Sequence, residues 1–465
     1  MAFLKSKQKR KQKTLKKGWF LHFFPLEFFD GLKRQQLISL GSLLSIILVF
    51  SPVIIWLMYM PSSLKNPLIG LAKFNAFMAI STLSINFFIS ARLKALEYLF
   101  NGLDRMYRVH KVIGRSSLFF MLLHPLFLII ASNKNTEELI QFVVPVGSID
   151  VSAGVIAVYV FLLLICLTVA VRIPYHWWHN SHKLLGIVLF LAGFHAVAAG
   201  SDIARFSVLR FWVIFLITLG LVSWIYMTFF YKVLGPRYKV SLHRVDHFTD
   251  VTEIYFKKPA GFSFQPGQFL FIRFPRFEGN KELFPFSISS DASQKMIRLS
   301  ISRSGDYTSE KVPLLKKGDT AIVMGPYGQF GNRYLKHNKD MVWIAGGIGI
   351  TPFLSLAKHE SIHPTGRKIL LLWAQKNKKD VFHNKELNLE TKRNTNFQYV
   401  SWISDKKGRV NGVDILHLVG GKDELKNRII FMCGPPPMMY SLSKEFHRMG
   451  ISFHQIIFED FNMLD

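Results

Sequence analysis

The sequence predicts a multi-domain membrane protein in which a six-helix transmembrane bundle is followed by an antiparallel β-barrel and then by an α/β domain with a parallel sheet. Three observations predict this fold class. Six apolar runs of roughly 20 residues occupy the first half of the chain, and short β-rich runs separated by Gly and Pro follow them. From Met341 onward, buried strands alternate with helical stretches. The 465 residues leave room for all three parts.

The composition excludes both a disordered chain and a wholly soluble enzyme, because 50% of the residues are hydrophobic and only 19% are charged. Cys166 and Cys433 are the only cysteines, which excludes a disulfide framework and a cysteine-based metal or iron–sulfur site. The formal net charge of +28 suits either nucleic acid or the anionic face of a membrane. The positions of the basic residues decide between these partners.

Residues 1–34 form a basic arm with few acidic residues. The apolar run after the arm, about 36–60, is too long for the core of a signal peptide. Further apolar runs lie near 69–90, 112–131, 154–174, 184–200 and 209–231. We therefore expect that the arm stays on the chain and that residues 35–232 form a six-span domain.

The charges of the connections predict the orientation of the spans. Basic residues gather between the second and third runs, whereas the connection after the third run has Lys134 against Glu137, Glu138 and Asp150. By the positive-inside rule, the basic arm is cytoplasmic, and an even number of spans returns the chain to that side. We expect a multi-pass protein of the cell membrane with both termini in the cytoplasm. Because the basic residues lie beside the spans, we expect contact with membrane lipid and not with nucleic acid.

Two of the predicted spans carry two histidines each. His110 and His124 belong to the third span, and His182 and His195 belong to the fifth. Ionisable side chains inside a membrane are costly and usually functional. Each pair is separated by roughly 20 Å along a helix, which places its members near opposite faces of the hydrocarbon core. Because both helices run in the same direction, His110 lies level with His182, and His124 lies level with His195.

Imidazoles that oppose each other at equal depth suit six-coordinate b-type haem, which takes one axial nitrogen from each side. A single histidine is better explained as a satisfied polar residue between helices, but four at matched depths favour two haems. The spacing in the fifth span misses the same helix face by about 140°, so we expect either a kink there or a shift in haem azimuth, which Gly186 or Gly193 could permit. His179 has a poorer spacing to His195 than His182 has, and we expect His176 and His179 at the membrane interface.

Two motifs of the β-rich part, residues 233–336, have chemistry that suits a flavin. In Phe284-Pro285-Phe286-Ser287-Ile288-Ser289-Ser290, an aromatic ring can pack on an isoalloxazine while a hydroxyl hydrogen-bonds its edge. In Gly305-Asp306-Tyr307-Thr308-Ser309, a Gly-rich turn can offer backbone N–H groups to a pyrophosphate. Taken singly, either motif is better explained as an ordinary strand or turn.

The α/β part, residues 337–465, has a more specific signal. In 343–352, Trp-Ile-Ala-Gly-Gly-Ile-Gly-Ile-Thr-Pro, a buried strand ends in glycines that open a helix, so a dinucleotide phosphate can approach the helix N-terminus. Cys433-Gly434-Pro435 ends another strand, and we expect both loops to face one ligand at the carboxyl ends of the strands. Lys376 follows a third strand, where contact with a 2′-phosphate and a solvated position are equally compatible with the pattern.

The order of these motifs resembles the NADPH oxidase and ferric reductase superfamily, over nearly the whole chain after residue 35, and the length is most similar to prokaryotic members. The resemblance implies a ferric-reductase-type domain with two b-type haems, joined to a ferredoxin-reductase-like FAD and NAD(P)H module. The matched haem iron ligands are His110, His124, His182 and His195. The matched flavin contacts are Pro285, Phe286, Ser287, Ser289, Gly305, Thr308 and Ser309. The matched nicotinamide-nucleotide contacts are Gly346, Gly347, Gly349, Thr351, Pro352, Cys433, Gly434 and Pro435.

Two positions depart from the family. Phe284 stands where the family usually has Arg or His, which removes one charged contact to the FAD phosphates. The family often ends on an aromatic residue that covers the flavin, and here Phe461 is the nearest candidate, with Asn462 to Asp465 after it.

The resemblance implies that NADPH, or NADH, reduces FAD in the cytoplasm and that electrons cross the membrane through the two haems to a small-molecule acceptor. Oxygen, which would give superoxide, is the first expectation, so the chain would be an NAD(P)H oxidase. A ferric chelate is the alternative acceptor. A third interpretation is a donor module that reduces a partner membrane or periplasmic protein, although no protein partner is indicated. NADPH is expected over NADH because of Lys376 and the family, and no catalytic side chain is expected beyond the cofactors.

Overall fold

The computed structural model describes residues 39–132, 136–171, 175–277, 283–377 and 383–459. The basic arm 1–34 and Phe461 lie outside these residues, so both stay predictions. The chain divides into two compact units. The first contains Met1–Leu96 and Arg105–Tyr231, and the second contains Glu97–Asp104 and Lys232–Asp465.

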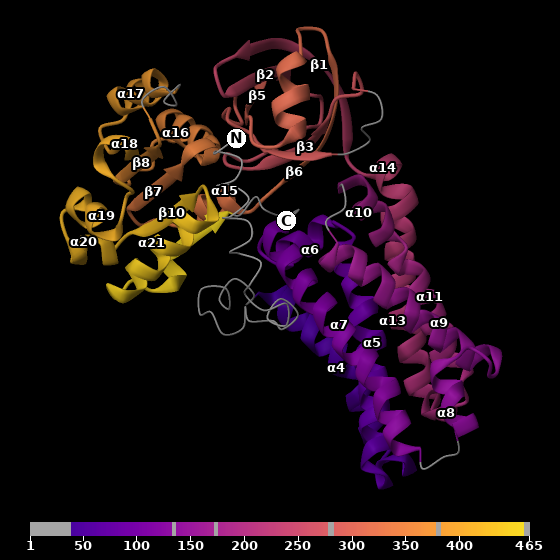
Figure 1. Ribbon diagram of the computed structural model, residues 1–465. Helices are drawn as coiled ribbons and strands as arrows, with labels where there is room; N and C mark the ends of the chain where they lie inside the picture. Colours follow the sequence, from indigo (N-terminus) through magenta and orange to yellow (C-terminus); the bar gives the residue numbers. More distant parts are fainter. Residues whose placement is uncertain (1–38, 133–135, 172–174, 278–282, 378–382, 460–465) are drawn as a thin grey trace, which may run out of the picture. The chain divides into compact units, whose positions relative to one another are not determined.

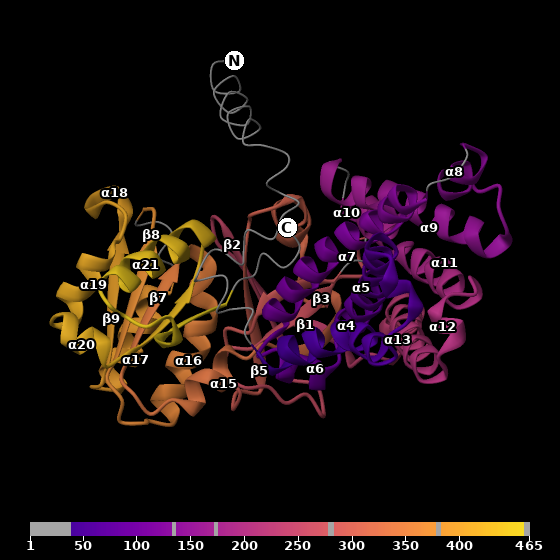
Figure 2. The ribbon, with the colours of Figure 1, turned by 90° about the horizontal axis from the view of Figure 1, so that it is seen from below.

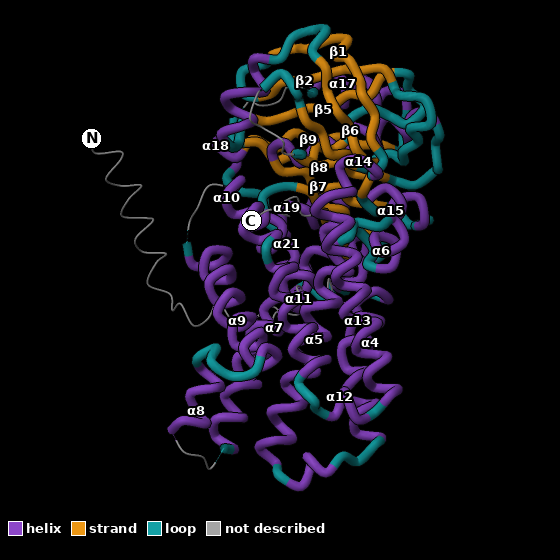
Figure 3. The backbone as a smooth tube through the Cα atoms, turned by 90° about the vertical axis from the view of Figure 1, so that its right-hand side faces the viewer, coloured by secondary structure: helices purple, strands orange, loops and turns teal. Residues whose placement is uncertain are grey.

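The first unit is a bundle of long helices (Figures 1 and 3). Six helices in the described part of the chain are long and apolar enough to cross a membrane, as predicted. They are α4 (Leu40–Met58), α5 (Pro67–Ser90), α7 (Leu103–Ala131), α9 (Ile149–Ile165), α11 (Leu185–Ala198) with α10 (Tyr175–Lys183) before it, and α13 (Ser207–Ile225). The third and fifth spans begin before their apolar runs, because a helix can also be built from the polar residues that precede such a run.

Helix α5 is the centre of the bundle. In its most apolar stretch 67% of the residues are buried, against 33% or fewer in the other spans. Gly220 of α13 lets that helix approach closely, since a Cβ there would lie 2.9 Å from the Cα of Ser84 in α5. Large apolar side chains on the outer helices are exposed, among them Ile46 and Phe211. This distribution is typical of a multi-pass membrane protein, whose outer faces meet lipid.

The second unit contains the predicted antiparallel barrel. Its strands are β1 (Arg237–His247), β2 (Val251–Lys257), β3 (Phe269–Arg273), β4 (Phe284–Ser287), β5 (Met296–Ser302) and β6 (Thr320–Tyr327). They pair in the order β4-β3-β6-β1-β2-β5. A bridge between Ile288, directly after β4, and Leu299 of β5 joins the two edges of this sheet. Alternating side chains such as Leu270 and Ile272 fill the interior.

The second unit also contains the predicted parallel sheet. Its strands are β7 (Met341–Gly346), β8 (Ile369–Gln375), β9 (Phe397–Ile403), β10 (Ile429–Cys433) and β11 (Ile456–Glu459), in the order β11-β10-β7-β8-β9. Figures 1 and 2 show α16 (Thr351–Ile362) and α17 (Asn384–Arg393) on one face, and α19 (Gly412–Val419) and α21 (Pro436–Arg448) on the other. From β7 the chain adds β8 and β9 on one side of the sheet, and it then adds β10 and β11 on the other side. The strand order thus reverses between β7 and β10, and sheets of this kind bind ligands at that point.

Candidate functional site

Two pairs of histidine rings face each other inside the helix bundle. The ring centroids of His110 on α7 and His182 on α10 are 6.1 Å apart. Those of His124 on α7 and His195 on α11 are 6.3 Å apart. The structure therefore brings together the two pairs that the sequence spacing predicts, at two depths in the bundle.

The spacing of the rings fits a haem iron between them. With iron–nitrogen bonds of about 2 Å on either side of the iron, the centroids of two axial imidazoles stand about 6.4 Å apart. Both observed separations lie within a few tenths of an ångström of this value. The residues present thus fit two six-coordinate haems, with His110 and His182 at one and His124 and His195 at the other.

Backbone carbonyls determine which nitrogen of three of these histidine rings is free to bind a metal ion. Nδ1 of His124 lies 2.9 Å from the carbonyl oxygen of Ala72, and Nδ1 of His195 lies 2.9 Å from that of Asp150. Nδ1 of His110 lies 3.2 Å from the carbonyl oxygen of an α5 residue, Asn86. A carbonyl oxygen only accepts, so each Nδ1 carries the proton and each Nε2 is left with its lone pair. An unprotonated Nε2 is what a metal ion requires.

The fifth span is interrupted at Leu184, between α10 and α11 and two residues before Gly186. The N–H of Ile187 donates to the Leu184 carbonyl at 2.9 Å, one residue short of the α-helical partner. The carbonyl of Lys183 instead accepts Nε1–H of Trp224 from α13, at 2.7 Å. Gly186 makes room, because a Cβ there would overlap the Trp224 indole. The sequence indicated the glycine but not the tryptophan that fills the space.

Gly154 of α9 is a site residue that sequence reasoning missed. A Cβ at this position would lie 2.8 Å from both Cγ and Nδ1 of His195, closer than real Cβ atoms pack. The ring of His195 therefore packs directly against the backbone of α9 at Gly154, with no side chain between them. On the other ring pair, His182 stacks on Trp178, with centroids 5.3 Å apart and planes 13° from parallel. A glycine within an apolar span was the only available signal for the first contact.

The two flavin motifs lie side by side in the barrel. Phe284 stacks on Tyr307, with ring centroids 4.1 Å apart, and so joins β4 to the turn that holds Gly305, Thr308 and Ser309. The Thr308 hydroxyl accepts the N–H groups of Ser304 and Gly305, both at 3.0 Å. A Cβ on Gly305 would meet open space. The turn is therefore held in shape from within and has room beside it for a phosphate group.

The remaining residues of the flavin motif differ in exposure. Pro285 and Phe286 are half-buried in β4, and Ser287 is buried at its end. Ser289 is fully buried, and its hydroxyl lies 3.1 Å from both the carbonyl oxygen of Arg298 and the hydroxyl of Ser300. The Ser289 hydroxyl thus already has partners inside the protein. It stabilises the flavin motif and does not offer a free hydroxyl group to a ligand.

The two glycine loops of the α/β domain meet at the reversal of the sheet. A Cβ on Gly349 would lie 2.7 Å from the backbone nitrogen of Gly434, and one on Gly434 would lie 2.9 Å from Cα of Gly346. Gly347 has φ +56°, a conformation that favours glycine, and opens to empty space. The structure therefore brings together the two loops predicted to face one ligand.

The other predicted nucleotide contacts surround this junction. Thr351 and Pro352 form the first turn of α16, and the Thr351 hydroxyl donates to the Ile348 carbonyl at 3.0 Å. Cys433 is buried at the end of β10, and Pro435 precedes α21. Lys376 is exposed after β8, at the same edge of the sheet, and its carbonyl accepts the N–H of Asp405 at 3.0 Å.

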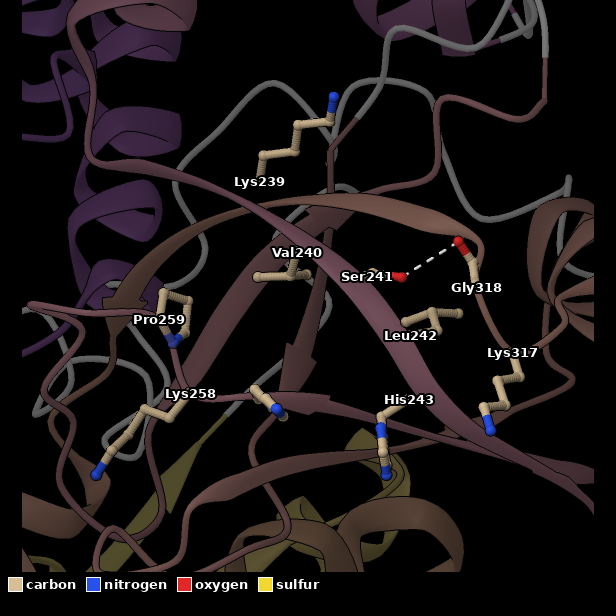
Figure 4. A pocket seen from close by; sticks show the side chains of 10 residues that line it. Lys239, Val240, Ser241, Leu242, His243, Lys258, Pro259, Lys317 and Gly318 are labelled. Atoms are coloured by element: carbon tan, nitrogen blue, oxygen red, sulfur yellow. Dashed lines mark hydrogen bonds between the residues drawn. The ribbon is translucent and has the colours of Figure 1, made fainter.

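A separate basic groove of about 460 Å³ lies on the outside of the barrel. It surrounds the point where β1 stops pairing with β6 and begins to pair with β2. Its lining includes four lysines, Lys239, Lys257, Lys258 and Lys317, and none of the predicted cofactor contacts. Figure 4 shows the ammonium groups of Lys239, Lys258 and Lys317 pointing away from one another. They do not converge on one anionic group.

Three family models match successive parts of the chain. Residues 75–193 match the ferric reductase like transmembrane component, residues 236–330 match an FAD-binding domain, and residues 343–444 match the oxidoreductase NAD-binding domain. The first match contains His110, His124 and His182 and ends two residues before His195, and the other two contain the flavin and nucleotide motifs.

Individual relatives match a little less than half of the chain. The reductase component of propane 2-monooxygenase from Rhodococcus jostii is 26% identical over 213 residues, which are 44% of this chain and 57% of the relative. Flavohemoprotein A of Dictyostelium discoideum is 25% identical over 238 residues, covering 48% and 59%. A ferredoxin NADP+ reductase structure from Neisseria gonorrhoeae, with bound FAD and NADP, aligns with TM-score 0.41 and 19% identity, covering 48% of this chain and 98% of that one. The chain thus spans less than two thirds of those two curated relatives. With a ferric-reductase-like membrane domain followed by FAD-binding and NAD-binding domains, it has the architecture of the NADPH oxidase and ferric reductase superfamily.

Proposed function

We propose that this protein carries electrons from cytosolic NAD(P)H across the cell membrane to oxygen, which it reduces to superoxide. The observation that carries the proposal is the pair of histidine couples, 6.1 and 6.3 Å apart, in the same chain as an FAD-binding and an NAD-binding domain. When bound, FAD takes up a hydride and releases single electrons, and haem iron carries one electron at a time.

The protein's own residues would hold and orient these cofactors. The glycine loops around Gly349 and Gly434 would receive the nucleotide at the carboxyl ends of β7 and β10. The turn at Gly305 would receive the flavin phosphates, and Pro285 and Phe286 would line the ring. The four histidines would hold two b-type haems, and the carbonyl contacts of His110, His124 and His195 leave an unprotonated Nε2 on those three rings.

The same geometry supports a particular route to the acceptor. If His124 and His195 occupy both axial positions, oxygen has no open coordination site unless a histidine leaves. Each electron would then pass at the haem edge to one oxygen molecule, with superoxide as the first product. A ferric chelate could accept an electron at the same edge, and it remains the alternative acceptor.

The acceptor is tested with the purified chain in detergent, supplied with NADPH and FAD. We expect cytochrome c reduction that superoxide dismutase suppresses, together with oxygen consumption. Negligible oxygen consumption with fast anaerobic reduction of a ferric chelate would overturn the oxidase proposal in favour of a ferric reductase. Cofactor turnover that requires an added membrane or periplasmic protein would favour a donor module.

The haem assignment is tested by substitution. We expect a low-spin bis-imidazole b-type spectrum with two haems per chain, and the loss of about one haem in His124→Ala or His195→Ala. His179→Ala is the matched control and should retain both. Full haem content in the first two variants would contradict the assignment.

A further inference from the structure

A buried network of charged side chains joins the barrel to the α/β domain within the second unit. Arg298 of β5 makes two parallel contacts with Glu386 of α17, from its two terminal nitrogens to the two carboxylate oxygens, each 2.9 Å long. The guanidinium also donates to Ser289 of the flavin motif, from Nε to the hydroxyl at 3.1 Å and from Nη2 to the carbonyl at 2.8 Å. Paired contacts of this kind fix both distance and angle.

His383, directly before α17, extends the network to a second strand of the barrel. Its Nδ1 lies 2.7 Å from Glu386, and its Nε2 lies 2.9 Å from Glu253 of β2. Glu253 also accepts hydrogen bonds from the hydroxyls of Tyr255 and Ser300. The side chains of His383 and Glu253 are only 6% and 4% exposed. Both ring nitrogens lie within ion-pair distance of a carboxylate oxygen, and this arrangement favours the ring with two protons and a positive charge.

The charges support this protonation state. Burial opposes the charge on His383, but its contacts with Glu253 and Glu386 outweigh burial and raise its pKa. Burial likewise opposes the charge on both glutamates, but the contacts with His383 and Arg298 lower the pKa of Glu253 and of Glu386 to about 2. Two cations and two anions therefore alternate through the network, and each has an oppositely charged neighbour.

The network lies between the two halves of the expected hydride-transfer site. On the barrel side it ends at Ser289, within the flavin motif. On the other side it fixes the start of α17, which follows the connection after β8 that begins with Lys376. A second contact across the same boundary, between His359 of α16 and Asp291 at 3.0 Å, places another histidine beside a carboxylate. These contacts connect the half that holds the nucleotide loops to the half that holds the flavin motif.

We propose that Glu253, His383, Glu386 and Arg298 are positioning residues that hold the nucleotide-binding half against the flavin-binding half, so that hydride transfer is fast only while His383 is protonated. The proposal rests on the proposed function, since it concerns the transfer from NAD(P)H to FAD. None of the four residues needs to touch either cofactor. A displacement of about 1 Å between reacting groups can cost about 100-fold in rate, so a small shift between the halves is sufficient.

The test is anaerobic stopped-flow reduction of FAD by saturating NADPH in the full-length protein. Glu386→Gln removes the charge from the double contact with Arg298, and His383→Gln removes the cation. We expect about tenfold slower reduction in either variant, the factor that the loss of one charged hydrogen bond implies. His417→Gln, at an exposed position in α19, is the matched control and should reduce FAD at the wild-type rate.

The pH profile separates positioning from a general loss of structure. Because its pKa is raised in the folded protein, His383 stays charged to higher pH than a free histidine, and the contact is lost as pH rises through that pKa. Wild-type FAD reduction should therefore slow as pH rises, whereas His383→Gln should be slow and insensitive to pH in the same range. Wild-type rates in both variants, or an unchanged pH profile in His383→Gln, would overturn the proposal. If wild-type protein with bound FAD is not reduced by NAD(P)H at all, the proposed function itself fails instead.

Discussion

Single carbonyl oxygens decide how the buried imidazoles can react. When Nδ1 donates a hydrogen bond, the opposite nitrogen becomes a stronger donor to a metal, and the ring is held in one orientation. Ala72 and Asp150 supply these oxygens to the pair His124 and His195 from two different helices. The histidines themselves could be selected from sequence, because their type and spacing are unusual inside apolar spans. Their partners could not, because a backbone carbonyl has no sequence signature.

Lys376 tests nucleotide preference at the residue scale. Its side chain is exposed at the edge of the sheet where the glycine loops meet, and only NADPH carries a 2′-phosphate that a cation can favour. We expect Lys376→Glu to raise the apparent KM for NADPH about tenfold and to leave that for NADH nearly unchanged. Steady-state rates with both nucleotides measure the difference. Equal effects on both would mean that Lys376 is only a solvated surface charge.

Glu459 provides a second prediction at this scale. The carboxyl group is 4% exposed, and burial, reinforced by the charges of Asp104 and Glu97, raises its pKa well above the usual value. The folded state therefore keeps this proton to higher pH than the unfolded state does, so Glu459 costs stability increasingly as pH rises above its unfolded pKa. We expect Glu459→Gln to stabilise the protein by about 1–3 kcal/mol near neutral pH and by less in acid.

Thermal unfolding followed through flavin release, at about pH 8 and about pH 5, measures this difference between the two proteins. Glu424→Gln is the control, because that side chain is 60% exposed and pairs only loosely with Arg428. A stabilisation of equal size at both pH values would show that Glu459 is charged in the folded protein.

Among the elements, the fifth span shows why helix periodicity alone does not place side chains. A straight helix would point His182 and His195 in different directions, and the break at Leu184 corrects this. The sequence predicts either a kink or a shift in haem azimuth, since the spacing of 13 residues misses the same helix face. It does not predict that Trp224, on another helix, would take the carbonyl of Lys183, because that contact depends on how α13 packs.

The contact between α9 and α11 gives a prediction at the element scale. Gly154→Ala adds only a methyl group, but that group would lie 2.8 Å from the His195 ring, so either the ring or the helix must move. We expect this variant to lose about one haem per chain, as His195→Ala does. Pyridine haemochrome absorbance measures the content. Gly70→Ala in α5, whose Cβ would meet its nearest neighbour at an ordinary 3.6 Å, should keep both haems.

Considered as a whole molecule, the chain places its parts in an order that sequence patterns reveal well. The six spans, the antiparallel barrel and the parallel sheet each have a distinct sequence pattern, and all three appear in the structure. The network around His383 had no such signal. It unites side chains from residues 253, 298, 383 and 386, which belong to two different domains and are far apart in the sequence except for the last two.

The proposed direction of electron flow gives a prediction for the intact protein in lipid vesicles. NADPH does not cross a bilayer, so when added outside it reaches only molecules whose nucleotide domain faces outward. We expect cytochrome c trapped inside to be reduced, and we expect an ionophore to accelerate the reaction, since each transferred electron otherwise works against about 2.3 kcal/mol per 100 mV. Reduction confined to cytochrome c outside the vesicles would contradict transmembrane transfer.

The imidazole planes in the two ring pairs are crossed, at 65° for His110 with His182 and 57° for His124 with His195. Axial ligands with parallel planes lift the degeneracy of the iron orbitals that point between them, whereas crossed planes leave those orbitals nearly equal in energy. An oxidised low-spin iron in such surroundings has a strongly anisotropic magnetic moment. Low-temperature electron paramagnetic resonance should therefore show two similar signals at unusually low field, which would report the packing of α7 against α10 and α11 without any variant.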